Sequence, residues 1–161
     1  MLYQALKVFT FICFNLLNML LGGNLPPFVC ICAIVEKEQR FLVIEQRSGK
    51  TVFPAGFVRW KEYPEQAVIR EGEEETGLEL RPICVFGYYP QSSNLIDRLS
   101  TFCIAYQAQV TGGKLRESIE GHPYWINEED LLDKLTPYYQ VIFQDYLQYR
   151  EQLSETNIHR A

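Results

Sequence analysis

The sequence predicts an α/β fold in which helices cover both faces of a mixed β-sheet. The chain has 161 residues, of which 47% are hydrophobic, so it can fill one core of ordinary domain size. Strand-like segments flank a single central helical segment, and two further helical segments end the chain. Because every sheet face and helix stripe must bury its apolar side against another element, this order indicates an α/β/α sandwich without internal repeats.

The chain divides into three expected parts: an apolar extension at residues 1–27, a compact domain at residues 28–155 and a tail at residues 156–161. In the domain, two β-rich runs separated by the charged residues 36–39 predict a hairpin. Pro64 in a first helical turn and Gly77 as a stop predict a helix over residues 64–76. The other expected elements are strands at residues 78–89, 98–110 and 122–127, a loop at 90–97, a turn at 111–113, and helices at 128–135 and 137–153.

The extension is apolar, with no charged side chain between Lys7 and Glu36. Its apolar run, residues 8–21, is shorter than the roughly 20 residues that span a bilayer, and leucines stand where a secretory cleavage site needs small residues. On a helical wheel, one stripe carries the polar side chains of Gln4, Lys7, Asn15 and Asn18. Four interpretations stay open. Residues 1–25 could form a helix that docks on the domain, on a partner or on a membrane surface. Alternatively, the extension could result from a start codon assigned too far upstream.

The composition excludes several classes of protein. Twenty acidic against fifteen basic side chains give a net charge of −5 and a pI near 5.1, so we expect no nucleic-acid polymer as a partner. The five cysteines form no C-x-x-C pair, which indicates reduced thiols in a cytoplasmic protein. Because His122 and His159 are the only histidines, a bound metal must be held by oxygen, which favours Mg²⁺ or Mn²⁺.

Three glutamates stand close together on the expected central helix. Glu71, Glu74 and Glu75 occupy positions i, i+3 and i+4, which puts their Cβ atoms about 5–6 Å apart on one face. Like charges at this spacing repel, and a hard divalent cation would relieve the repulsion. A solvated acidic face explains the spacing equally well, as it does for Glu73, which points away from the other three.

A longer pattern decides between these two explanations. It reads G-x5-E-x7-R-E-U-x-E-E-x-G-U, where U is a bulky aliphatic residue, and its fixed positions are filled by Gly56, Glu62, Arg70, Glu71, Glu74, Glu75 and Gly77. This pattern is the Nudix box, and the chain resembles a Nudix hydrolase. Leu78 fills the last aliphatic position, but Gly72 stands at the first, where glycine should destabilise the helix by about 1 kcal/mol relative to alanine.

The resemblance implies a fold and a set of metal ligands. The fold is the Nudix-type α/β/α sandwich with a mixed β-sheet. The implied ligands of Mg²⁺ or Mn²⁺ are the carboxylates of Glu71, Glu74 and Glu75 and the carbonyl oxygen of Gly56. Some family members draw a further ligand from the loop that holds Glu120.

The resemblance also implies a reaction, in which water attacks a phosphoanhydride bond. Metal ions neutralise the diphosphate and lower the pKa of a bound water. Among the catalytic residues Glu71, Arg70 and Glu74, we expect Glu71 to accept the proton of that water and Arg70 to orient Glu71. Glu120 is the alternative base, and Glu62 is expected to stabilise the loop before the helix.

Substrate choice depends on residues outside the box. The family usually cleaves a nucleoside diphosphate linked to another group, so we expect a small nucleotide-like substrate. Arg47, Lys50 and Arg59 could bind its phosphates. Aromatic residues that could stack on its base are Phe53, Phe57, Tyr88 and Tyr89. Two other functions stay open, a non-catalytic domain that senses a nucleotide and a module attached to a membrane or a partner by the N-terminal helix, and the chain could form the homodimer found in many relatives.

Overall fold

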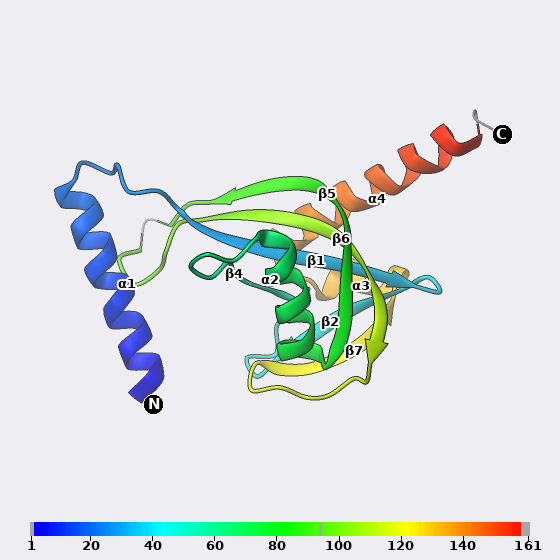
Figure 1. Cartoon of the computed structure of the whole chain (residues 1–161), viewed down its shortest axis with the longest axis horizontal. Coiled ribbons are helices and arrows are strands. Elements are labelled where there is room, and N and C mark those ends of the chain that lie inside the picture. Colours follow the sequence, from blue (N-terminus) through cyan, green and yellow to red (C-terminus); the bar gives the residue numbers. More distant parts are fainter. Residues whose placement is uncertain (1, 94, 159–161) are drawn as a thin grey trace.

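Helices lie on both faces of a seven-stranded β-sheet in the computed structural model of this chain, which describes residues 2–93 and 95–158 (Figure 1). The helices are α1 (Leu2–Leu20), α2 (Pro64–Glu71), α3 (Glu128–Lys134) and α4 (Pro137–Ile158), and a π-helical turn, η1 (Gly72–Thr76), continues α2. The strands are β1 (Phe28–Lys37), β2 (Arg40–Gln46), β3 (Thr51–Val52), β4 (Ala55–Phe57), β5 (Leu78–Gln91), β6 (Thr101–Gly113) and β7 (Gly121–Asn127).

The sheet contains both strand orientations. Its strands follow the order β3-β2-β1-β6-β5, with β4 paired to β1 and β7 paired to β2. β1 runs parallel to β6 and antiparallel to β2 and β4. This mixed sheet, covered by helices on both faces, confirms the α/β/α sandwich that the sequence predicts.

Two hydrophobic cores lie on opposite faces of the sheet, and β1 contributes to both. Ile31, Ala33 and Val35 pack with side chains of α2. Cys32 and Ile34 pack instead with side chains of α3 and α4. The alternation follows from the two-residue period of a strand, and because both faces are covered, the middle of β1 is apolar without interruption. β1 thus joins the central helix to the C-terminal helices.

The first hairpin forms where the charged residues predict it. Glu38 and Gln39 turn the chain from β1 into β2 with φ of 53° and 60°, the left-handed region that two-residue hairpin loops use. The prediction for the later strands is wrong in three places, the first being that β6 begins at Thr101 rather than at residue 98. β5 includes Pro90, which the sequence assigns to a loop, and β6 includes residues 111–113, which it assigns to a turn. β5 tolerates proline because it is the edge strand of the sheet, so its long pairing with β6 continues past Pro90.

The central helix begins at Pro64 and stops at Gly77 as predicted, but its last turn is wider than an α-helical turn. From Gly72 the chain follows the π-helical turn η1, and Gly77 then takes a φ of 75°. Gly72 lies against the side chain of Leu80 on β5, and a Cβ atom on Gly72 would lie 2.5 Å from Leu80 Cγ. The glycine that departs from the box therefore allows β5 to pack closely on the helix.

Replacing Gly72 with alanine should destabilise the protein, although alanine normally stabilises a helix relative to glycine. The new methyl group would overlap Leu80, and overpacking typically costs about 1–3 kcal/mol, against a gain of about 1 kcal/mol in helix propensity. Urea unfolding measures the change in free energy of unfolding. In a Leu80→Ala background, which opens this space, the same substitution should lower the free energy of unfolding much less. A Gly72→Ala protein more stable than the wild type would contradict the packing argument.

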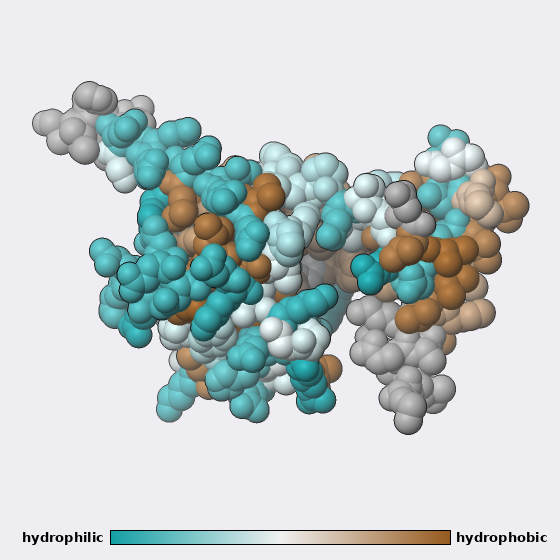
Figure 2. Space-filling view, turned by 180° about the vertical axis from the view of Figure 1, so that it is seen from behind, coloured by the Kyte–Doolittle hydropathy of each residue, from teal (hydrophilic) through white to brown (hydrophobic). Residues whose placement is uncertain are grey.

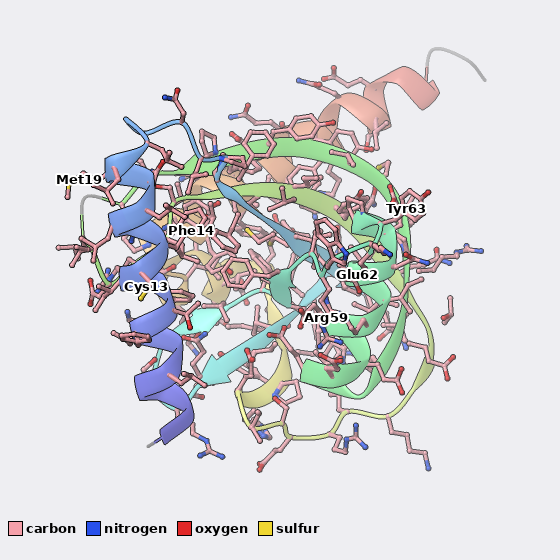
Figure 3. The ribbon with its side chains drawn as sticks, turned by 60° about the vertical axis from the view of Figure 1, so that its left-hand side comes forward. Cys13, Phe14, Met19, Arg59, Glu62 and Tyr63 are labelled. Atoms are coloured by element: carbon pink, nitrogen blue, oxygen red, sulfur yellow. The ribbon has the colours of Figure 1, made fainter. Side chains whose placement is uncertain are left out.

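α1 stands apart from the sheet at one end of the molecule (Figure 1). Asn15 Nδ2 donates hydrogen bonds to the carbonyl oxygens of Ile96 and Arg98 at 2.7 and 2.9 Å. The rings of Phe14 and Phe28 pack with their centroids 4.8 Å apart, and Phe14 points toward the domain in Figure 3. Asn15, one residue of the expected polar stripe, therefore faces the rest of the chain, and the side chains of Gln4 and Lys7 lie outside the described part.

The outward face of α1 is apolar and exposed, as Figure 2 shows. Its exposed large side chains are Leu6, Val8, Phe9, Leu16, Leu17, Met19 and Leu20. Met19 points away from the domain in Figure 3. Among the helices in the described part of the chain, none is both long and apolar enough to cross a membrane.

The last helix is longer than the sequence predicts. α4 ends at Ile158 rather than at residue 153, so the first residues of the expected tail are helical, since no glycine or proline interrupts the segment. Residues 159–161 of that tail lie outside the described residues. The helix packs on the sheet through Ile142, Phe143 and Tyr146, which are buried.

Candidate active site

The end of α2 and the turn η1 bring two buried glutamates against β4. Glu75 accepts a hydrogen bond at 2.9 Å from the backbone N–H of Ala55. Glu71 packs on Gly56 so closely that a Cβ atom on Gly56 would overlap its carboxylate. The absence of a side chain at Gly56 therefore allows the approach of Glu71, and the backbone of β4 forms one wall of the site.

Arg70 joins the helix to the loop that precedes it. Its Nε and Nη2 atoms donate to the two carboxylate oxygens of Glu62 at 2.7 and 2.9 Å, and Nη2 also donates to the carbonyl oxygen of Phe57. Its Nη1 atom donates to Glu71 at 2.5 Å and to Glu74 at 3.3 Å. The side chain of Arg70 is only 15% exposed, and its hydrogen bonds to Glu62 lower the pKa of that carboxyl to about 2.

Glu74 lies on the open side of the site. Its side chain is 48% exposed, and Arg59 Nη2 donates to both of its carboxylate oxygens at 3.0 and 2.9 Å. Arg59 belongs to the loop between β4 and α2, where its backbone N–H donates to Glu62 at 2.7 Å. Figure 3 shows Arg59 and Glu62 beside the central helix. The loop thus supplies a second arginine to the acidic helix.

The three helix glutamates differ in their surroundings, whereas the sequence predicts one uniform carboxylate face. Glu71 and Glu75 are buried and Glu74 is exposed, because the wider π-helical turn changes the α-helical spacing. Burial raises the pKa of Glu75 well above its usual range, and a hydrogen bond with Glu120 raises it further. Burial also raises the pKa of Glu71, although Arg70 opposes that effect. Burial thus disfavours the ionised forms of Glu71 and Glu75, and a bound cation would favour them.

The chemistry of this donor set fits a divalent metal ion. One cavity of about 700 Å³ is lined by the carboxylates of Glu71, Glu74, Glu75 and Glu120. Carboxylate oxygens are the ligands that Mg²⁺ prefers, and a cation would offset the cost of the buried charge. Arg70 donates a hydrogen bond to Glu71, and Arg59 donates to Glu74. Within the residues that the structure describes, no three His, Cys, Asp or Glu side chains are arranged to hold a metal ion. Metal binding would therefore require some of these side chains to move.

The three predicted phosphate-binding residues lie in different places. Arg47 lines the acidic cavity, together with Arg116, which the sequence does not single out. Lys50 lines a second cavity, of about 520 Å³, which also borders β4. Arg59 instead pairs with Glu74. The structure thus brings Arg47 and Arg59 to the acidic glutamates and separates Lys50 from them.

The second cavity is a feature that sequence reasoning misses. Its lining includes thiol, aromatic and neutral polar side chains, among them Cys30, Gln46, Phe57, Thr101, Cys103, Tyr138 and Tyr139. These residues come from β1, β2, β4, β6 and the start of α4, so no local pattern connects them. Of the aromatic residues proposed to stack on a base, Phe57 lines this cavity, Phe53 is fully buried, and Tyr88 and Tyr89 line a different pocket.

Residues 25–146, most of the chain, match the family model of the NUDIX domain. The chain belongs to the Nudix family. The matched range contains the whole β-sheet and every residue of the site described above. It therefore confirms the resemblance that the box indicates.

Two named Nudix proteins show how far the similarity extends. The ADP-ribose pyrophosphatase of Methanocaldococcus jannaschii is 30% identical over 130 residues, which cover 78% of this chain and 76% of that protein. The NAD-capped RNA hydrolase NudC of Vibrio vulnificus is 37% identical over 92 residues, 55% of this chain but 33% of that protein. The chain thus spans about a third of NudC and about three quarters of the pyrophosphatase. It is a Nudix pyrophosphohydrolase.

Solved Nudix structures share the fold of this chain. A Nudix hydrolase from Nitrosomonas europaea superimposes with a TM-score of 0.68 at 23% identity, over 76% of this chain and 90% of that one. The MutT protein of Methanosarcina mazei Go1 also gives a TM-score of 0.68, at 22% identity, over 79% of this chain and 97% of that one. The likeness confirms the sandwich architecture.

Proposed function

We propose that this Nudix enzyme uses Mg²⁺ or Mn²⁺ to hydrolyse the pyrophosphate bond of a small compound linked to a nucleoside diphosphate, with ADP-ribose as the representative substrate. The observation that carries this proposal is the pair of buried carboxylates, Glu71 and Glu75, held against β4 with raised pKa values. Ionised carboxylates at this site would repel a diphosphate unless cations neutralise both partners.

The proposed metal ligands are the carboxylates of Glu71, Glu74 and Glu75, with Glu120 and the carbonyl oxygen of Gly56 as additional ligands. Support comes from the single cavity that the four carboxylates line and from the packing of Glu71 on Gly56. A bound divalent cation would supply charge neutralisation and a more acidic water.

The residues of the chain would hold the reacting groups and move one proton. The water oxygen forms a bond to a phosphorus atom, the bridging P–O bond breaks, and the proton of the water goes to a base. We assign Glu71 as that base because its carboxylate lines the acidic cavity and Arg70 keeps it in place. Glu120, which is in hydrogen-bond contact with Glu75, is the alternative base.

ADP-ribose is favoured over a capped RNA as the substrate class. The named ADP-ribose pyrophosphatase matches along about three quarters of its length, whereas NudC matches along a third. A net charge of −5 also disfavours an RNA chain. In this assignment, the second cavity, beside β4, takes the nucleoside, which can stack on Phe57 or Tyr138. Lys50 at that cavity and Arg47 at the acidic cavity would meet phosphate oxygens.

With Mg²⁺ or Mn²⁺ present, the purified chain should cleave ADP-ribose to AMP and ribose 5-phosphate, and EDTA should abolish turnover. A panel of ADP-ribose, NADH, a nucleoside triphosphate and a UDP-sugar, with products separated by chromatography, tests the substrate class. Hydrolysis in ¹⁸O-labelled water shows which phosphorus is attacked. Turnover that persists in EDTA would contradict the metal assignment, and cleavage of the triphosphate alone would contradict the substrate class.

A further inference from the structure

Arg59 forms an ion pair with Glu74, which is one of the proposed metal ligands. Its Nη2 atom donates to both carboxylate oxygens of Glu74, which lines the acidic cavity together with Glu71 and Glu75. We propose that Arg59 is a positioning residue that leaves Glu74 when a divalent cation binds and then turns to the phosphates of the substrate. This inference rests on the proposed function, because it needs a metal ion at Glu74.

The two arginines that donate to Glu74 differ in how firmly they are held. Arg70 is 15% exposed and donates to Glu62, Glu71 and Phe57, so it cannot leave without stranding buried partners. The Arg59 side chain is 60% exposed, and in the described part of the chain its only acceptor is Glu74. Exposed ion pairs contribute little to stability, so Arg59 is the arginine that can be released.

A divalent cation competes strongly for the same carboxylate. The guanidinium carries one delocalised charge and lies 2.9 Å or more from the oxygens of Glu74. Mg²⁺ carries two charges and approaches carboxylate oxygens to about 2.0–2.1 Å. Because Coulomb attraction rises with charge and falls with distance, the cation displaces Arg59. Arg70 Nη1 also donates to Glu74, but at 3.3 Å this hydrogen bond is longer than the two from Arg59.

The backbone of Arg59 stays fixed while its side chain exchanges partners. Its N–H donates to Glu62 at 2.7 Å, its carbonyl oxygen accepts from the Glu62 N–H at 3.1 Å, and Glu62 is held by Arg70. The released guanidinium therefore remains near the acidic cavity. Planar guanidinium groups suit phosphate oxygens, so metal binding at Glu74 makes a phosphate donor available beside the metal.

The test measures metal affinity without turnover. Electron paramagnetic resonance of free Mn²⁺, titrated with protein and no substrate, gives the Kd. Arg59→Gln should bind Mn²⁺ about two- to fivefold more tightly, the range that an exposed ion pair contributes. The KM for ADP-ribose should rise about tenfold in the same variant, because a charge-assisted phosphate contact is lost. Arg40→Gln removes another exposed arginine, paired with Glu38 away from the site, and should change neither value.

A second variant shows whether the change in Mn²⁺ affinity depends on Glu74. In a Glu74→Gln background, Arg59→Gln should no longer change the Kd for Mn²⁺. Unchanged or weaker Mn²⁺ binding in Arg59→Gln alone, with Mn²⁺ bound normally by the wild type, would overturn this inference and leave the proposed function intact. A wild-type chain that binds no Mn²⁺ would overturn both.

Discussion

Replacing Glu71 with glutamine should lower kcat for ADP-ribose hydrolysis by about 10²- to 10⁴-fold while the protein stays folded. The amide can neither take a proton from water nor offer a carboxylate to a cation, so both proposed roles of Glu71 are lost. The fold should survive because burial already disfavours the charge of Glu71, and the amide oxygen can still accept the hydrogen bond from Arg70. Steady-state kinetics at saturating Mg²⁺, with circular dichroism of both proteins, measures these two quantities.

Glu73→Gln is the matched control for this experiment. Glu73 lies on the same turn, η1, and its side chain is exposed. The control should keep the kcat of the wild type. If Glu71→Gln also keeps it, the general base is a different residue, and Glu120 becomes the residue to substitute.

Replacing Arg70 with methionine should lower the free energy of unfolding by about 3 kcal/mol, because removing one partner of a buried ion pair leaves an unpaired charge behind. The side chains of Glu62 and Glu71, its main partners, are 13% and 11% exposed. Urea denaturation at neutral pH measures the loss. Arg40→Met is the control: its partner Glu38 is 69% exposed, so the change should be less than about 1 kcal/mol.

The stability advantage of the wild type over Arg70→Met should shrink at low pH. Hydrogen bonds from Arg70 lower the pKa of Glu62 to about 2, from an ordinary value of 4.5. A carboxyl with a lowered folded-state pKa adds stability above its unfolded pKa and loses it as the pH falls toward the folded pKa. The advantage should therefore decline between about pH 4.5 and pH 2. A constant advantage over that range would contradict Glu62 as the main partner of Arg70.

Features that depend on neighbours along the chain could be predicted from the sequence. The hairpin at residues 36–39 and the helix start at Pro64 both follow from local turn and helix signals. The box also places Glu62, Arg70 and Glu71 on one loop and helix, and the structure brings these three side chains into contact. Short sequence separation limits the conformations that such residues can take, so their pattern carries structural information.

Features that depend on packing between elements could not be predicted. The α-helical spacing of the three glutamates suggests one uniform face, but η1 is a π-helical turn, and Gly72 in it packs on Leu80 of β5. The pair of Arg59 and Glu74 likewise joins a loop to a helix turn. The lining of the second cavity, beside β4, comes from seven separate elements. None of these contacts leaves a periodic signal in the sequence.

The sequence by itself determined the family, the class of fold and the group of glutamates at which the chemistry is proposed, because the spacing of the box is specific. Only the tertiary structure decided that Glu71 and Glu75 are buried, that Glu74 stays exposed, and which arginines Glu71 and Glu74 meet. The physical reason is that burial and ion pairing depend on which segments pack together, and the free energy of a carboxylate changes greatly with its surroundings.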